Sequence, residues 1–389
     1  MQAPYLDFLD PDFSTRSEAV RAARAASWYA RTPFGIAVLR HREVGLLLRD
    51  KRLRQGSHAW PQHTGLQGSF ADFWTNSVIA KEGPDHQNLR RIAQAGLHQT
   101  AIEALAPAFT NIAETLLDGL AGRQTIELMG DFTTPFAGQA ICTLLGLPRQ
   151  DWRRVAEDAT RLGLAMGVAA KQHEATVNAA TDRLMALAEE LLHRDSGAPD
   201  TFVGRLVEAR GEASDDELLN LIVISIFGGV DTTRAQLGFG MALFIDHPAQ
   251  WQAFKADAAL IPATVEEFIR ARPTTTWATR EAVEDVEIGG RRINAGTVLH
   301  LLVHASARDP EICEDPRFDI TRPRKRHFGF GGGAHHCIGH FVARTDLAAA
   351  LTALQETFAT VEYDGDPEWM PDSGNTGPIR LPIRYEVAA

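Results

Sequence analysis

The feature that most constrains the fold is one uninterrupted helical pattern from Ser214 to Asp246. Ser214 and Glu217 have the spacing of a capping box, and Pro248 stops the pattern just after it ends. A helix of about 30 residues at ~1.5 Å per residue is roughly 45 Å long, enough to cross a whole domain of this size. Because its middle is apolar on nearly all sides, we expect a buried central helix.

Helical patterns also cover most of residues 15–270, for example Ser17–Ala30 and Ala175–Arg194. Residues 54–82 differ, because Gly, Pro, His and Trp are scattered there without a period. We expect a long loop, either functional or a surface excursion. From Arg280 to Ala305, short β-like runs alternate with glycine-rich turns. The sequence therefore predicts a mainly α fold with a smaller β region.

Charge excludes two classes of partner. The 389 residues carry a formal net charge of −11, whereas proteins that bind nucleic acid or anionic membranes favour basic surfaces. Three widely spaced cysteines do not indicate a disulfide framework, and we expect no signal peptide. The most apolar stretch, from Leu218 to Val230, is shorter than the ~20 residues of a membrane span. We expect a single domain over residues 1–389, monomeric and cytoplasmic.

One cysteine, Cys337, lies in a glycine-rich stretch with several histidines, "RHFGFGGGAHHCIGH". A zinc ion would need further spaced ligands, and adjacent side chains such as His336 and Cys337 rarely converge on one ion. A catalytic nucleophile would need a base and an oxyanion hole, which no motif indicates. Haem iron needs a single axial thiolate, since the porphyrin supplies the in-plane ligands. An ordinary structural cysteine in a glycine-rich loop is the remaining alternative.

The neighbours of Cys337 are consistent with haem. Gly331, Gly333 and Gly339 provide backbone without Cβ, which a loop passing close to a flat macrocycle requires. Amides after the cysteine are placed to donate to its sulfur, and a helix that begins near Gly339 directs its positive end toward a thiolate. Phe330 is placed to shield the sulfur from water.

The stretch "FGGGAHHCIG" resembles the haem-binding signature of the cytochrome P450 superfamily, and the chain resembles its soluble bacterial type. The matching positions are Phe330, Gly331, Gly333, His335, Cys337 and Gly339. The chain departs from many relatives at Ala334, where proline is common. The resemblance implies the P450 fold, with heme b (iron protoporphyrin IX) between the long central helix and the loop that carries the ligand Cys337.

The resemblance extends to residues that brace the fold and bind haem. Glu267 and Arg270 match the family's Glu-x-x-Arg pair, with Arg322 of "FDITR" as its third member. The family's His-x-x-x-Arg motif corresponds to His86 and Arg90. Together with Arg280 and His335, these two residues are implied to bind the haem propionates, although each alone is typical of a surface residue.

In the long helix, "FGGVDTT" resembles the family's oxygen-binding groove. Gly228 removes a side chain where a ligand could lie, and the Thr232 hydroxyl can bond to the Gly228 carbonyl and open the helix locally. The resemblance implies that Asp231 and Thr232 manage protons. A glycine kink that serves helix packing is the alternative.

The implied activity is that of a monooxygenase, which inserts one atom of O2 into an organic substrate. We expect electrons from a ferredoxin and its NAD(P)H-dependent reductase. The basic run Arg324, Lys325 and Arg326, extended by Arg91, is the expected docking surface for the acidic donor, whereas charge runs are in general solvated faces.

The substrate pocket is expected to contain the 54–82 segment, Phe227, Val230, Thr275 and Trp277. The tryptophan and its neighbouring threonines favour an amphipathic or aromatic guest, and a secondary metabolite such as a polyketide or an aromatic acid is the leading expectation. The substrate could be free or tethered to a carrier protein.

Two other functions stay open at this point. A haem-thiolate peroxygenase would use H2O2 directly; such relatives tend to place an arginine where this chain has Asp231 and Thr232, although Arg234 is close by. A non-enzymatic haem- or metal-binding protein would use the His/Cys cluster and gives no reason for the groove in the long helix.

Overall fold

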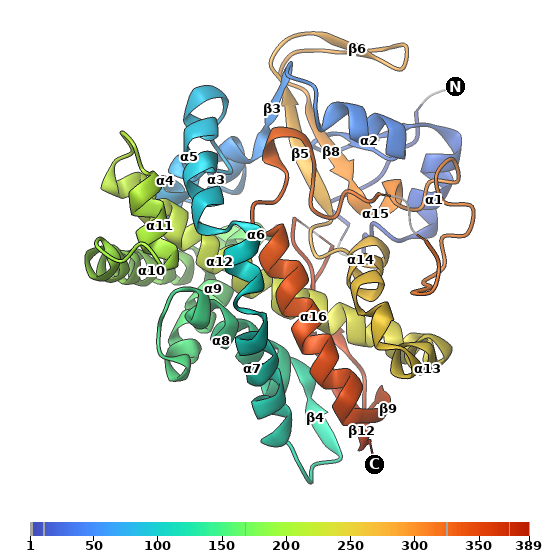
Figure 1. The fold of residues 1–389 in the computed structure, drawn as a ribbon. Coiled ribbons are helices and arrows are strands. Elements are labelled where there is room, and N and C mark those ends of the chain that lie inside the picture. Colours follow the sequence, from blue (N-terminus) through green and yellow to red (C-terminus); the bar gives the residue numbers. More distant parts are fainter. Residues whose placement is uncertain (1–2, 11, 168, 324–325, 373, 389) are drawn as a thin grey trace.

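The computed structural model describes residues 3–10, 12–167, 169–323, 326–372 and 374–388. Helices form most of it and surround one long central helix, α12 (Asp215–Asp246), while a smaller β region lies at the upper end in Figure 1. The mainly α fold with a smaller β part is therefore confirmed.

Helix α12 begins with the predicted capping box. The Ser214 hydroxyl accepts from the Glu217 amide, and the Glu217 carboxylate accepts from the Ser214 amide at 2.9 Å. The helix ends at Asp246, and Pro248 opens the next helix, α13 (Pro248–Ala256). By length and composition α12 could cross a membrane, but 67% of its most apolar window is buried inside this fold, as in the core helix of a globular protein.

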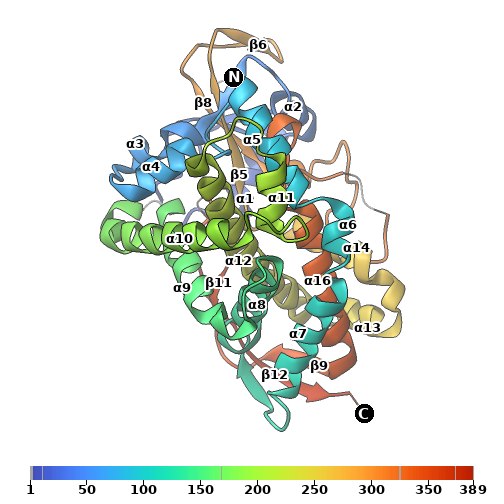
Figure 2. The same cartoon turned by 60° about the vertical axis from the view of Figure 1, so that its left-hand side comes forward.

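Several helices pack directly against α12, and Figure 2 shows them layered around it. They are α4 (Ser69–Asn76), α5 (Gly83–Gly96), α8 (Thr134–Leu144), α9 (Trp152–Gly163), α10 (Glu174–Asp195), α11 (Phe202–Ala209), α13, α14 (Ile261–Ala271) and α16 (His340–Thr357). The remaining helices lie further out: α1 (Glu18–Ala26), α2 (His41–Leu47), α3 (Trp60–Thr64), α6 (Gln99–Glu103), α7 (Ala106–Asp118) and α15 (Val303–Ser306).

The β region is built on a five-stranded mixed sheet of order β1-β2-β8-β5-β3. Its strands are β1 (Tyr29–Thr32), β2 (Gly35–Val38), β3 (Leu53–Gln55), β5 (Trp277–Ala282) and β8 (Val298–Leu302). Strands β3 and β5 pair antiparallel, which places Gln55 directly across from Arg280. This pairing joins the N-terminal part of the chain to its C-terminal half beside the candidate site.

Smaller sheets complete the β structure. Strand β12 (Pro382–Val387) lies between β4 (Thr125–Glu127) and β9 (Phe358–Tyr363), while β6 (Val286–Ile288) pairs with β7 (Arg291–Ile293) and β10 (Glu368–Trp369) with β11 (Pro378–Arg380).

Two expectations about local structure were wrong. Residues 54–82 are not a long loop, since they include the end of β3, a 3₁₀ helix at Gly56–Ala59, and helices α3 and α4. The first helix ends at Ala26 rather than Ala30, because the following residues join the sheet as β1. Contacts with distant segments override the local pattern in the first case, and a hairpin between β1 and the adjacent β2 overrides it in the second.

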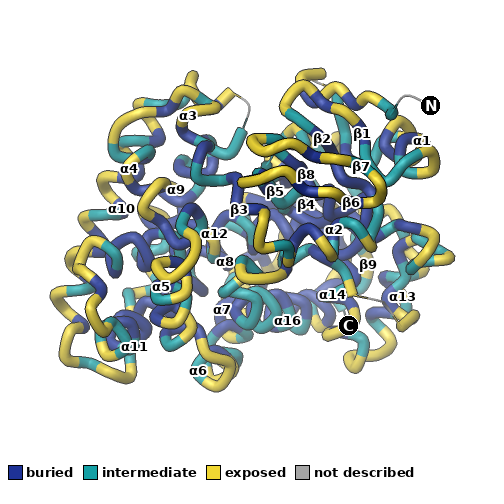
Figure 3. Tube along the Cα trace, turned by 90° about the horizontal axis from the view of Figure 1, so that it is seen from above, coloured by how far each residue is buried: buried dark blue, intermediate teal, exposed yellow. Residues whose placement is uncertain are grey.

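The hydrophobic core is divided between the two ends of α12. Apolar side chains of its first half pack with α8 to α11, and those of its second half with α7, α13, α14 and α16. Figure 3 shows these inner segments as buried and the outer turns as exposed. The middle of α12 is thus almost entirely buried by other segments. A residue that is exposed there marks a place where protein atoms do not cover the helix.

Candidate functional site

The loop before α16 is tied closely around Cys337. The Cys337 amide donates to the carbonyl of Phe330 at 2.9 Å, and the Gly339 amide donates to the Cys337 sulfur. Helix α16 then begins at His340 with Gly339 as its N-cap, as the sequence predicts. The backbone therefore fixes the position of the sulfur from both sides.

Cys337 is exposed, yet the protein atoms packed around it are dense enough to raise the pKa of its thiol. The Gly339 amide and the charges of Arg90 and Arg344 oppose this effect of burial. A side chain that is both accessible and enclosed lines an internal hollow rather than the outer surface. Binding of a cation to this sulfur would displace its proton.

Two glycines of the loop are required by geometry. Gly331 and Gly333 have φ of 67° and 70°, a region that side-chain-bearing residues rarely adopt. A Cβ on Gly333 would also collide with the carbonyl oxygen of Leu48 at the end of α2. By contrast, a Cβ on Gly339 would meet nothing within 4 Å. The first two glycines shape the turn, and the third borders open space.

The middle of α12 contains the hydrogen bond that its sequence predicts, within a helix that stays continuous. Gly228 is exposed within an otherwise buried helix, and a Cβ there would meet nothing within 4 Å. The Thr232 hydroxyl donates to the Gly228 carbonyl at 2.6 Å, which draws that carbonyl toward the side chain. One residue further on, Thr233 donates to Asp346 of α16 at 3.0 Å and ties the two helices together.

Asp231 lies beside this opening but is already engaged. Its Oδ1 accepts from a guanidinium nitrogen of Arg234 at 2.8 Å, and both side chains are buried. Its carboxylate faces Gly163 at the end of α9, where a Cβ would approach it to 3.4 Å. The two residues predicted to manage protons therefore bond to different partners, Asp231 to Arg234 and Thr232 to the Gly228 carbonyl.

The four residues expected to bind propionates lie in elements that converge near Cys337. The His86 ring packs tilted against the His335 ring, with 4.0 Å between the ring centroids. Burial, then the nearby His335, lowers the pKa of His86 to about 4, and burial lowers the pKa of Arg280 to about 10. Burial also lowers the pKa of Arg90, which the nearby Cys337 opposes. The group offers several donors and two cationic side chains in a poorly hydrated region.

Two residues of this region were not predicted. The Glu82 carboxylate accepts from His335 Nε2 at 3.0 Å and from the Gln55 amide at 2.5 Å. Burial would raise the pKa of Glu82, but the bonds from His335 and Gln55 together lower it. The Gln55 side chain accepts from Arg280 at 2.7 Å. Because Gln55 and Arg280 are far apart in the chain, no local sequence pattern predicts their contact across β3 and β5.

The Glu267–Arg270 pair is buried behind the loop. Two guanidinium nitrogens of Arg270 donate to the Glu267 carboxylate at 2.6 and 2.7 Å. Arg322 pairs with Asp315 and, at 2.8 Å, with Asp319. Its link to Glu267 runs through Asp319, whose amide donates to Glu267 at 2.9 Å. The three residues form one connected network, although the direct contacts of Arg322 differ from those expected.

A second network, also not predicted, supports Phe330. Glu266 accepts from Arg344 at 2.5 Å and bonds with His327 at 3.1 Å. The Arg344 guanidinium lies over the Phe330 ring, 4.5 Å from its centroid. A signal was present, since Glu266 directly precedes the Glu-x-x-Arg pair, but nothing in the sequence assigns it a partner.

The residues expected to line the substrate pocket differ in how accessible they are. Trp277 is half-buried and stacks on Phe8 at 5.1 Å, and Thr275 donates to Asn375 at 3.3 Å. Phe227 is buried, and Val230 has no exposed surface because it packs in the core with α8 to α11. In this structure Val230 is not open to a ligand.

The expected basic docking run is partly described. Arg326 is exposed, whereas Arg324 and Lys325 lie outside the described residues. Arg91 donates to the Ala209 carbonyl and to Asn88, both at 2.8 Å, which holds it against α11.

These residues fit haem. An enclosed but accessible thiol provides the single axial ligand, and positions without side chains at Gly228 and Gly339 leave room for a flat group. His86, Arg90, Arg280 and His335 provide donors suited to two carboxylates. Within the described residues, no group of three or more His, Cys, Asp or Glu is arranged to hold a metal ion, which removes support for a zinc site.

Comparison with protein families and curated proteins agrees with this chemistry. The family model described as Cytochrome P450 matches residues 139–388. Luteothin monooxygenase of Streptomyces thioluteus is 34% identical, over 99% of this chain and 97% of its own length. The 20-oxo-5-O-mycaminosyltylactone 23-monooxygenase of Streptomyces fradiae is 31% identical, over 93% of this chain and 86% of its own length.

Among solved structures, cytochrome P450 CYP109Q5 from Chondromyces apiculatus shares the fold. It aligns with a TM-score of 0.88 and 27% identity over 100% of both chains.

Proposed function

Because the chain is a monooxygenase of the cytochrome P450 family, we propose that it inserts one atom of O2 into a small secondary metabolite, a polyketide or an aromatic compound. The names of two relatives, which refer to luteothin and to a mycaminosyltylactone, support this substrate class. The observation that carries the activity is the Cys337 thiol, accessible inside the fold while the central helix is open at Gly228.

The resident cofactor in this proposal is heme b with Cys337 as its iron ligand. Bound haem supplies oxygen activation at a thiolate-bound iron, and the thiolate favours O–O cleavage. The Gly339 amide donates to the sulfur and limits its charge donation. His86, Arg90, Arg280 and His335 bind the two carboxylates, with Gln55 holding Arg280 in place.

Proton handling is assigned to Thr232 and Asp231. The Thr232 hydroxyl donates its proton to the Gly228 carbonyl, so its oxygen lone pairs are available to accept from ordered water. Asp231 is buried and paired with Arg234, so it delivers a proton to the site only when that pair separates or water connects it. The pair also engages Arg234, which counts against the peroxygenase alternative because that mechanism needs an arginine free to hold a carboxylate.

The substrate side is assigned to Trp277 at the start of β5, to Thr275 just before it, and to Phe227 of α12. Trp277 offers an aromatic face and Thr275 a hydroxyl, which suits a guest with both apolar and polar parts. The guest is either free or tethered to a carrier protein.

Partners and location complete the proposal. Electrons come from a ferredoxin and an NAD(P)H-dependent ferredoxin reductase, which dock on the basic side that includes Arg326. The protein is a cytoplasmic monomer with one domain over residues 1–389.

The test uses purified protein loaded with haem. The reduced carbon monoxide complex is expected to show the long-wavelength Soret band of thiolate ligation, and Cys337→Ala to lose it. Candidate polyketides and aromatic acids are then screened for displacement of iron-bound water and for turnover. Turnover on H2O2 that equals turnover with NAD(P)H and redox proteins would establish the peroxygenase instead, and absence of the thiolate band in the unaltered protein would remove the proposal.

A further inference from the structure

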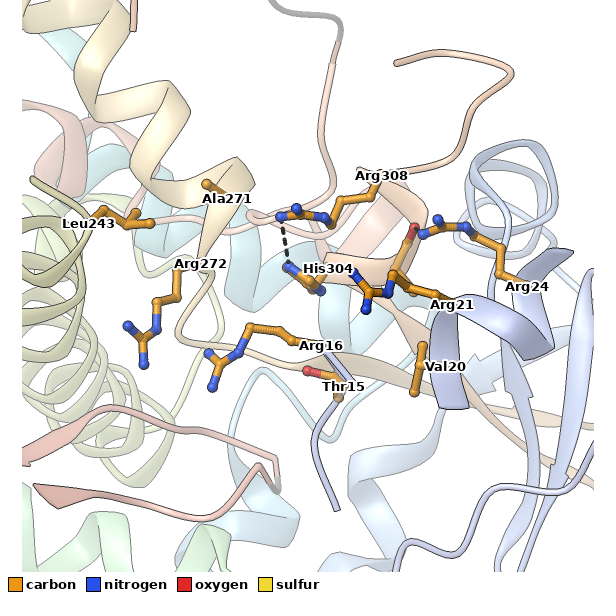
Figure 4. A pocket seen from close by; sticks show the side chains of 11 residues that line it. Thr15, Arg16, Val20, Arg21, Arg24, Leu243, Ala271, Arg272, His304 and Arg308 are labelled. Carbon is orange, nitrogen blue, oxygen red and sulfur yellow. Dashed lines mark hydrogen bonds between the residues drawn. The ribbon is translucent and has the colours of Figure 1, made fainter. Parts of the chain in front are cut away.

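A second cavity, of about 320 Å³, shares no lining residue with the site described above. It lies between α1, the C-terminal ends of α12 and α14, and α15 (Figure 4). Its polar lining is dominated by five arginines, Arg16, Arg21, Arg24, Arg272 and Arg308, together with the imidazole of His304. Such a concentration of arginine is unexpected in a chain with a net charge of −11.

Carboxylates neutralise part of this charge. Arg21 pairs with Glu18, Arg16 approaches Asp372 at 3.8 Å, and Asp309 lies near Arg24. Arg272 and Arg308 have no ion pair with any carboxylate in the described part of the chain, although Asp246 and Asp372 lie close enough to Arg272 to oppose the lowering of its pKa. Several cations therefore face one partly open cavity with fewer carboxylates than arginines around it, and the like charges repel one another.

Arg272 is the most enclosed of these cations. Its guanidinium lies against both rings of the stacked pair Phe239 and Trp369, 4.3 and 3.9 Å from their centroids. Burial, then the charge of Arg16, lowers the pKa of Arg272 to about 10. Its Nε is buried without a hydrogen-bond partner among the described residues. The two rings fix the position of the cation and leave donors unused.

His304 lies between Arg308 and Arg16 in the lining of the cavity (Figure 4). The side chain is 5% exposed, and its Nε2 lies 3.4 Å from a guanidinium nitrogen of Arg308. Its Nδ1 is buried and makes no close hydrogen bond among the described residues, although the Thr15 backbone is near enough to favour the protonated ring. Burial and the charges of Arg308 and Arg16 outweigh that contact and hold the pKa of His304 well below its ordinary value, so the ring is neutral at pH 7.

We propose that this cavity binds a small multivalent oxyanion, the phosphate or carboxylate groups of a metabolite. Guanidinium groups present paired donors that match both groups, and an anion would relieve the repulsion among the arginines. The volume accommodates a molecule of several non-hydrogen atoms beyond the charged group. Arg21 is exposed, so the cavity meets solvent beside α1. The site is independent of Cys337 and of the monooxygenase substrate.

The test follows thermal unfolding of the haem-loaded protein with pyrophosphate or citrate, at an ionic strength held constant with sodium chloride. Either probe is expected to raise Tm along a saturating curve, and the probe that acts identifies the anion class. Arg16→Gln and Arg21→Gln are the informative variants, because 34% and 57% of these side chains are exposed and folding should be preserved. Each is expected to weaken the apparent Kd about tenfold.

Arg123→Gln is the matched control, since it removes the same charge from a residue paired with Asp131 outside the cavity. The control should bind both probes as the unaltered protein does, and all variants should keep the thiolate band of their carbon monoxide complex. A Tm that does not respond to either probe, or equal weakening in the control, would overturn the proposal.

Discussion

Thr232 shows how one side chain prepares a helix for chemistry. Its hydroxyl donates to the Gly228 carbonyl at 2.6 Å. Because Gly228 has no side chain, there is open space beside this part of α12. The sequence was sufficient to predict this contact, because donor and acceptor are four residues apart on one helix. Asp231 and Arg234 are three residues apart and so share a helix face, but the sequence did not show that the acid would pair with this arginine.

Thr232→Ala is expected to keep the fold and uncouple electron use from product. Without the hydroxyl, water in the groove loses an acceptor, so product formation should fall about 100-fold, the lower end of what a positioned acid–base group contributes, while NAD(P)H consumption continues. Product and NAD(P)H are measured in the same assay. Thr232→Ser, which keeps the hydroxyl, should retain coupling; a fully coupled alanine variant would contradict the assignment.

Glu266 gives a prediction for pH. Burial would raise the pKa of this carboxyl, but hydrogen bonds from His327 and Arg344 overcome that effect and lower the pKa to about 2. The folded-state pKa is therefore below the unfolded value of about 4.3, so the carboxylate stabilises the fold fully above about pH 5 and progressively less as pH falls toward 2.

Glu266→Gln should consequently lower Tm at pH 7, and the gap to the unaltered protein should narrow below pH 4. The gap should correspond to at most about 1 kcal/mol, because the carboxylate is 38% exposed and water screens its charge. Thermal unfolding from pH 7 to pH 3 measures it. A gap that is constant across this range would show that the carboxylate charge is not responsible.

At the scale of elements, α12 was the most predictable part of the molecule. Its start, its end and its burial follow from a capping box, a proline and a continuous apolar pattern, all of which are local. Helices α3 and α4 were missed for the opposite reason. They are held by distant groups: Trp60 donates to the Ala165 carbonyl at 2.7 Å, and the Asn178 side chain accepts from the Phe70 amide at 2.9 Å.

Ser214→Ala should destabilise the protein by about 1 kcal/mol, because it removes the side-chain acceptor at the start of α12. Urea unfolding measures the loss. Ser225→Ala is the matched change within the same helix, where the hydroxyl bonds to the Leu221 carbonyl, which already belongs to the helix, and little effect is expected. Equal losses would mean that the cap contributes nothing specific.

Two glycines of α12 should respond oppositely to alanine. At Gly240 a Cβ would collide with the Phe268 ring of α14, so Gly240→Ala should cost about 1–3 kcal/mol through overpacking. At Gly228 the Cβ enters open space, so Gly228→Ala should not destabilise the haem-free chain but should weaken substrate binding. Urea unfolding and substrate titration separate the two effects. Unfolding of the Gly228 variant at lower urea would contradict the open groove.

At the scale of the whole molecule, the segment that contains α3 and α4 packs against α10, and the Asn178 side chain makes several of the contacts that attach it. Asn178 accepts from Phe70, donates to the Gln67 carbonyl at 2.9 Å and lies against Gly68. The composition of residues 54–82 gave no indication of this attachment, because half of each contact is more than a hundred residues away.

Asn178→Ala should weaken the attachment of the α3–α4 segment to α10 without disturbing the core. We expect limited proteolysis to cleave within residues 56–76 several-fold faster, since local opening there requires fewer contacts to break. Asn76→Ala is the control, because its side chain donates within α4 to the Asp72 carbonyl. Equal cleavage rates in the two variants would show that Asn178 does not attach the α3–α4 segment.

The pairing of Gln55 with Arg280 and of Glu82 with His335 sets an order of events during biosynthesis. Gln55 and α12 precede Cys337 in the chain, so the ribosome releases them first. Nascent chains therefore present the apolar α12 before the cysteine proposed to bind iron. With haem bound at Cys337 as proposed, loading follows the synthesis of α12, and a shortage of haem in the cell would leave an unloaded protein that is exposed to proteases and chaperones.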